Sequence, residues 1–136
     1  MTPKQITLIQ ESLRKVPPEA AAELFYDRLF TLDPDLKRLF VGDIKEQGSK
    51  LMSMITIVVN GLMDLEPLLP TVRALGARHA AYGVKPEHYD TVGDALLWTL
   101  AQGLGDDFTD DVRQAWADAY GLLSSTMIQA SLPKAA

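Results

Sequence analysis

The chain contains no cysteine, which excludes disulfides, thiolate metal sites, iron–sulfur clusters and cysteine nucleophiles. Histidine is scarce, with 2 in 136 residues, so each histidine can be considered individually. Long apolar runs are missing as well. The longest, from about Met54 to Met63, is interrupted by Thr56, Asn60 and Gly61, and it is too short and too polar to span a bilayer. We therefore expect no membrane partner.

Basic residues are outnumbered by acidic ones: the chain has 13 Lys and Arg and 18 Asp and Glu, so its net charge is -5. Without a basic cluster, the chain is a poor candidate for binding nucleic acid. Residues 1–5 show no basic region followed by an apolar run, so we expect no signal peptide and a cytoplasmic location. The length, with 47% hydrophobic residues, predicts one globular domain over residues 1–136.

Strand signals are scarce, whereas helix starts and stops are frequent. Thr2-Pro3-Lys4-Gln5 has the pattern of an N-cap, a first-position proline and a capping-box glutamine. The chain therefore predicts an all-α domain of seven or eight helices. The expected helices start at residues 2–5, 16–19, 33–34, 44, 67–70, 86 and 106–111, and the one from residue 44 runs to about residue 64.

His79 is the more informative histidine. It lies on a predicted helix that stops at Gly83, in line with Leu75, Val72 and Leu68 on one helical stripe. An imidazole placed in this way can coordinate a metal with one nitrogen and donate its other N–H to a backbone carbonyl one turn earlier. We interpret His79 as the axial ligand of a haem iron. The alternative is a core histidine that hydrogen-bonds to a neighbour.

Two further polar residues stand on apolar stripes. Gln47 precedes Leu51 by one turn, so its amide faces the core or a cavity unless it is an exposed first-turn residue. Tyr26 is flanked by Leu29 and Phe30. Its hydroxyl either faces a cavity or donates a hydrogen bond to a carbonyl where two helices meet. A buried donor without a partner costs about 1–3 kcal/mol, so each of these groups needs one if it is buried.

Together these residues predict a cavity between the helix of Gln47 and the helix of His79. The cavity would have a metal ligand on one side and two hydrogen-bond donors, from Tyr26 and Gln47, on the other. Such an arrangement suits a diatomic ligand on a flat cofactor. Leu51 would contact the cofactor on the same side as the two donors. Phe40, at the corner over residues 40–43, could stack on the edge of the cofactor ring.

The chain resembles the globin family, most closely the bacterial single-domain haemoglobins and the haem domain of flavohaemoglobins. The resemblance covers essentially the whole chain in collinear order. It implies the globin fold, with seven to eight helices in a three-over-three sandwich around haem b (iron protoporphyrin IX). The segments that carry it are residues 24–30, 47–52, 75–79, 82–84, 86–89, 92–97 and 115–121.

The resemblance also implies a role for individual residues. His79 would be the proximal iron ligand, Tyr26 and Gln47 the distal donors to a bound gas, and Leu51 the apolar residue one turn further on. Six other residues would contact the haem, and the two basic ones among them would meet its propionates unless they are simply solvated. These six are Phe40, Lys50, Arg78, Val84, Tyr89 and Val92, and the last three match positions near the proximal edge of the haem.

Two departures from flavohaemoglobins stand out. Flavohaemoglobins place a glutamate near the end of the last helix, joined to the proximal histidine through the tyrosine that corresponds to Tyr89, and the matching position here is Ser131. Without this carboxylate, His79 should donate less charge to iron, which argues against strong peroxidase-like or dioxygenase chemistry. No reductase portion follows before Ala136, so electrons are expected from a separate reductase.

The first functional hypothesis is therefore haem-based binding of O2, with slow O2 release set by Tyr26 and Gln47, and with NO and CO as further ligands. The second is an enzyme, an NO dioxygenase that depends on an external reductase. A ligand sensor with a partner protein and a helical protein without haem are the remaining alternatives.

Overall fold

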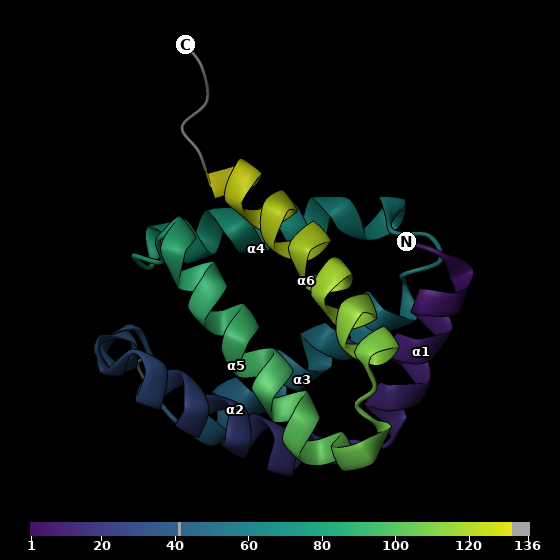
Figure 1. The fold of residues 1–136 in the computed structure, drawn as a ribbon. Coiled ribbons are helices and arrows are strands. Elements are labelled where there is room, and N and C mark those ends of the chain that lie inside the picture. The colour runs from purple at the N-terminus through teal and green to yellow at the C-terminus, as the bar shows by residue number, and fades with distance from the viewer. Residues whose placement is uncertain (41, 132–136) are drawn as a thin grey trace.

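The computed structural model describes residues 1–40 and 42–131. Within these ranges the chain forms six α-helices, three short 3₁₀ helices and no strand (Figure 1), so the all-α prediction is confirmed. None of these helices is both long and apolar enough to cross a membrane. The elements in chain order are α1 (Pro3–Arg14), α2 (Pro18–Leu32), η1 (Pro34–Leu39), α3 (Ile44–Asn60), η2 (Glu66–Leu68), α4 (Leu69–Ala81), α5 (Pro86–Leu104), η3 (Gly105–Asp107) and α6 (Asp110–Ser131).

Most helix starts follow from local sequence signals. Thr2 begins α1 with the predicted capping box, in which its side chain and that of Gln5 each accept a hydrogen bond from the other residue's backbone N–H. Asp33 and Asp43 cap η1 and α3 by accepting a hydrogen bond from the backbone N–H two residues further on. These oxygens satisfy N–H groups that a helix start leaves unpaired.

The six α-helices form two layers, with α1, α3 and α4 in one layer and α2, α5 and α6 in the other. Between the layers, α4 and α1 pack on α6 and α3 packs on α2, while α2 packs on α5 within its own layer. By contrast, α3 and α4 hardly touch each other. Each is held in place by a different helix of the opposite layer, α3 by α2 and α4 by α6.

The largest part of the core surrounds Trp116 on α6, which is 4% exposed. Side chains from α1, α3 and α5 pack against it, including Ile9 and Leu100. The indole N–H donates to Ser12 Oγ at 2.8 Å, and the Ser12 hydroxyl donates to the carbonyl of Ile9 at 2.9 Å. The buried polar atoms of this core are therefore paired, which avoids the cost of an unsatisfied donor.

The helix predicted over residues 44–64 ends earlier, because α3 stops at Asn60 and Gly61 caps it. Glycine is a common residue at a helix end, and here it also meets a side chain seven residues further on. The side chain of Leu68, from η2, lies so close to Gly61 that a Cβ there would overlap it. The chain turns at this glycine and starts the path that leads to α4.

The contact between α4 and α6 depends on Gly76. A Cβ at this position would overlap the backbone of Met127 on α6, so only glycine permits the observed approach. Since Gly76 lies one turn before His79 on the same helix, this contact also sets how far His79 projects from α6.

We expect Gly76→Ala to lower the free energy of unfolding by about 1–3 kcal/mol, because the added methyl group must push α4 away from α6. Chemical denaturation measures the change. Gly121→Ala is the matched control. Gly121 lies within α6 with open space around it, so alanine there should raise stability by about 0.5–1 kcal/mol. Equal effects of the two substitutions would show that α4 does not depend on this contact.

Candidate functional site

The structure gathers most of the predicted site residues into two clusters of packed side chains. The first cluster contains Tyr26, Phe40, Leu51 and Val92. The second contains Val84 and Tyr89, together with Leu75 and other side chains of α4 and α6. The two walls of the site therefore belong to different parts of the core.

Tyr26, on α2, is held by aromatic neighbours. Its ring meets Phe25 and Phe40 edge-on, with centroids 5.2 and 5.3 Å away, and stacks at 5.9 Å on Phe30. The residue is only 7% exposed, and burial raises the pKa of its hydroxyl to about 12. Near neutral pH the group is therefore a protonated donor, and no other described residue accepts a hydrogen bond from it.

Gln47 reaches the same wall from α3. Its neighbour Gly48 lies where α2 and α3 cross, and a Cβ on Gly48 would be 2.9 Å from the Ala22 side chain and 3.7 Å from the ring of Tyr26. This close crossing brings the first turn of α3 beside Tyr26. Gln47 is half-buried there, with Leu51 one turn further along.

His79 lies on α4, one turn after Leu75 of the second cluster. The side chain is half-buried, and its Nδ1 lies 2.8 Å from the carbonyl oxygen of Leu75, as predicted. A carbonyl can only accept, so Nδ1 must carry the proton. In the neutral ring Nε2 then has a free lone pair, which is the form that coordinates a metal.

The end of α4 is tied down just after His79. The backbone N–H of Val84 donates to the carbonyl of His79 at 3.0 Å. Gly83 permits this turn because its φ is 95°, a conformation that costs glycine little. The Leu39 side chain approaches Gly83 from η1, so the corner after α2 lies against the end of α4.

Behind α4, the ring of Tyr89 is 8% exposed and its hydroxyl is buried without a hydrogen-bond partner among the described residues. Burial raises the pKa of this hydroxyl. Its backbone carbonyl accepts a hydrogen bond of 2.6 Å from the Tyr120 hydroxyl of α6. Ser131, which we expect to match the glutamate of flavohaemoglobins, donates a hydrogen bond from its hydroxyl to the carbonyl of Ile128 at 2.6 Å.

The basic candidates lie at the rim. Lys50 and Arg78 are exposed, and the Lys50 ammonium lies 4.0 Å from the Glu46 carboxylate. Such an exposed pair contributes little to stability, so Lys50 is free to meet another anion. The second histidine, His88, accepts a hydrogen bond from the backbone N–H of Lys85 at 3.0 Å and so helps to begin α5.

Metal binding by this site would rest on one protein ligand. Over residues 1–40 and 42–131, no three His, Asp or Glu side chains gather in a way that could hold a metal ion. His79 could therefore hold a metal only if a cofactor supplied the other ligands. The side chains clustered with Tyr26 and with Tyr89 are largely apolar, which suits a planar, mostly apolar cofactor.

Three site-forming residues were missed by the sequence analysis. Gly48 and Gly76 permit close helix crossings, and Tyr120 ties α5 to α6 through the carbonyl of Tyr89. The two glycines inside helices were a usable signal, because a helical glycine costs about 1 kcal/mol and often marks a close contact. Nothing local to Tyr120 identifies its partner.

Comparison with known proteins gives one consistent result. The family model described as Globin matches residues 23–127. Flavohemoproteins from Chromobacterium violaceum and Halalkalibacterium halodurans are 36% and 35% identical to the chain over 107 and 114 residues, which are 76% and 82% of it. The matched regions are 26% and 28% of those relatives, so the chain spans about a quarter of their length.

A solved structure extends the comparison to the whole fold. A bacterial globin from Campylobacter jejuni superposes with a TM-score of 0.83 and 28% sequence identity, and the match covers 96% of each chain. The predicted globin fold, with its two layers of three helices, is therefore confirmed.

The raised pKa of Tyr26 gives a test of its burial. Because its hydroxyl ionises near 10 in the unfolded chain and near 12 in the folded one, the unfolded state loses a proton first as the pH rises. The free energy of unfolding should therefore fall by about 1 kcal/mol per pH unit between about pH 10 and pH 12. Urea unfolding from pH 8 upward should show a shallower fall for Tyr26→Phe. Tyr82→Phe, at a side chain 67% exposed, should leave the fall unchanged. An identical profile for wild type and Tyr26→Phe would show that this hydroxyl is not buried.

Proposed function

This chain belongs to the globin family, and we propose that it holds haem b between α3 and α4 and binds O2 and other diatomic gases there. Family membership implies a haem cofactor, and the residues on both walls fit one. A ferrous haem supplies reversible binding of diatomic gases. The rest of the proposal concerns what the chain's own side chains contribute.

The observation that carries the proposal is the hydrogen bond between Nδ1 of His79 and the carbonyl of Leu75. It selects the tautomer whose Nε2 can hold iron, and it fixes the plane of the ring. The acceptor is a neutral carbonyl rather than a carboxylate, and Ser131 offers no negative charge. His79 would therefore act as a neutral imidazole, which suits reversible gas binding better than oxidative chemistry.

On the opposite wall, Tyr26 and Gln47 would supply selectivity. A gas ligand that acquires partial negative charge is stabilised by donors aimed at it. A hydrogen bond to a charged partner contributes about 1.5–3 kcal/mol, and about 1.4 kcal/mol is tenfold in affinity. Two such donors would slow the release of O2 far more than that of CO, which carries little charge. Leu51 and Phe40 would keep water from the same space.

At the rim, other side chains fit the edge of a haem. The exposed ammonium of Lys50 and guanidinium of Arg78 could each meet a propionate. Val84 and Val92 would pack on the two faces, and Tyr89 would lie against the proximal side. The buried and unpaired Tyr89 hydroxyl is a donor that a cofactor or a bound water would satisfy.

A second candidate function is NO dioxygenation, favoured by the similarity to flavohemoproteins. NO and O2 would combine to give nitrate with the uptake of one electron, supplied by a separate reductase. The same Tyr26 and Gln47 donors would serve this reaction. Steady NO consumption with an added flavin reductase, compared with the reductase alone, separates the enzyme from a protein that only binds gas.

The test of haem binding is the absorption spectrum of the purified protein, loaded with haem. Wild type should show a Soret band, and His79→Ala should lose the band or shift it strongly, because it removes the imidazole proposed to hold the iron. His88→Ala is the matched control and should keep the wild-type spectrum. An unchanged Soret band in His79→Ala would remove His79 as the ligand.

Oxygen dissociation kinetics test the distal donors. Tyr26→Phe should raise the O2 dissociation rate by about tenfold or more, because it removes one hydrogen bond of about 1.5–3 kcal/mol, while the CO dissociation rate should change much less. Stopped-flow mixing of the O2 complex with excess CO measures the first rate. The control Tyr82→Phe should match wild type. A Tyr26→Phe rate equal to wild type would contradict a role for this hydroxyl.

A further inference from the structure

Basic side chains gather on one face of the molecule, although the chain as a whole is acidic. Residues 37–50 and 78–85 contain 6 basic and only 2 acidic residues, which leaves 7 basic and 16 acidic residues in the rest of the chain. The nearest acidic residues outside these two segments, Asp35 and Glu87, do not cancel the positive excess. The basic side chains of the two segments are all exposed, and we call them the basic face: Lys37, Arg38, Lys45, Lys50, Arg78 and Lys85.

The two segments meet in space at the corner after α2. The Leu39 side chain lies against Gly83, 3.7 Å from the position that a Cβ would take there. This contact brings Arg38, which precedes Leu39, near Lys85, which lies two residues after Gly83. Figure 1 shows η1 and the corner between α4 and α5 on one side of the molecule, and the corner between α5 and α6 on the other.

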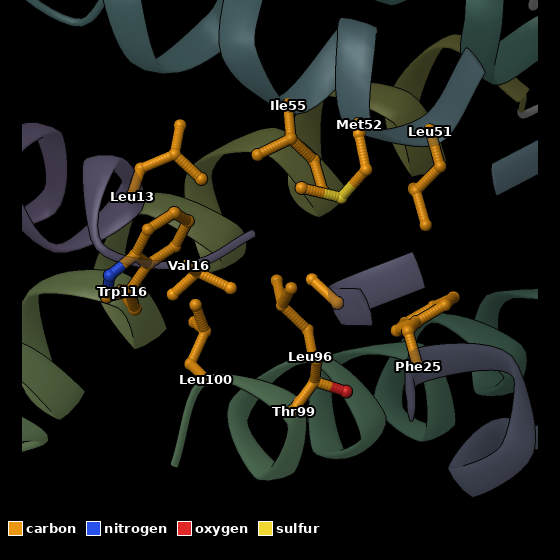
Figure 2. Close-up of a pocket in the computed structure, with 11 residues that line it drawn as sticks. Leu13, Val16, Phe25, Leu51, Met52, Ile55, Leu96, Thr99, Leu100 and Trp116 are labelled. Atoms are coloured by element: carbon orange, nitrogen blue, oxygen red, sulfur yellow. The ribbon is translucent and has the colours of Figure 1, made fainter. Parts of the chain in front are cut away.

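The start of α3 joins the basic face to the proposed gas site. Leu51 points inward from α3 (Figure 2) and packs in one cluster with Tyr26 and Phe40. Lys50, just before Leu51, is exposed, so it lies at the edge of that cluster. The basic face therefore borders the wall that carries the proposed distal donors.

The corner between α5 and α6 has the opposite charge. Four exposed aspartates lie there: Asp106, Asp107, Asp110 and Asp111. The Lys15 ammonium, 3.5 Å from the Asp107 carboxylate, offsets only one of them. The molecule thus has a positive side at the proposed haem edge and a negative corner away from it. Such a separation of charge orients an approaching protein so that its negative surface meets the basic face.

We propose that the basic face is the docking surface for a protein electron donor, a reduced flavoprotein whose own docking face is acidic. Both proposed functions need ferrous iron, so an electron has to enter from outside the chain. One electron would leave the partner's flavin and reduce ferric to ferrous iron, and no bond in this chain would form or break.

An electron donor fits this surface better than other acidic partners, because the face lies at the edge where Lys50 and Arg78 would meet the haem. Docking there brings the donor close to the group that must be reduced. The role of the partner rests on the proposed function, whereas the affinity of the basic face for an acidic protein does not.

Reduction kinetics test the proposal. The probe is the hydroquinone form of a flavodoxin with a strongly negative net charge, mixed with the ferric, haem-loaded protein in a stopped-flow apparatus. The second-order rate constant of reduction should fall by about tenfold or more between about 10 and about 300 mM NaCl, because salt screens the attraction. A rate constant that stays constant or rises with salt would overturn the proposal.

Lys45→Glu combined with Lys85→Glu reverses two charges of the basic face. Both residues lie at helix starts, where a carboxylate is favourable, so this variant should fold as wild type does. Lys4→Glu combined with Arg113→Glu is the matched control, with the same change in net charge near the starts of α1 and α6. The first pair should lower the rate constant at low salt by about tenfold, and the control should change it by less than about twofold. Equal effects of the two pairs would show that net charge alone governs the rate and would contradict a docking face.

A titration followed by NMR separates this inference from the proposed function. When oxidised flavodoxin is added to isotope-labelled protein, amide signals of η1, the first turns of α3 and residues 78–85 should shift, and the shifts should vanish at about 300 mM NaCl. A protein that takes up no haem would contradict the proposed function alone, because the shifts still report whether an acidic protein docks here. Shifts confined to other surfaces would overturn the proposal, and so would a short DNA duplex that binds the same residues more tightly than flavodoxin does.

Discussion

The hydrogen bond from His79 Nδ1 to the carbonyl of Leu75 is the interaction on which the proposed gas site depends. It joins two residues that are one helical turn apart. It decides which ring nitrogen can hold a metal and in which plane the ring lies. Gly76, between these two residues, lets α4 rest on the backbone of α6. The orientation of the ring and its distance from the core are thus set within a single helical turn.

The opposite wall is built on the same principle. Gly48 lets α3 cross α2 closely, and this crossing brings the turn of Gln47 to Tyr26. The ring of Tyr26 is fixed by three aromatic neighbours, and in the proposed function its hydroxyl would meet a ligand. Because α3 and α4 are each supported by a helix of the opposite layer, neither has to contact the other.

The sequence alone predicted the all-α class, the helix starts at Thr2, Asp33 and Ile44, and the hydrogen bond of His79, because each depends on contacts within one turn of helix. The resemblance to globins supplied the roles of Tyr26 and Gln47. Local signals could not show that Gly76 meets Met127 or that Tyr120 reaches the carbonyl of Tyr89. These features join residues far apart in the chain, so only the packing of the folded helices decides them.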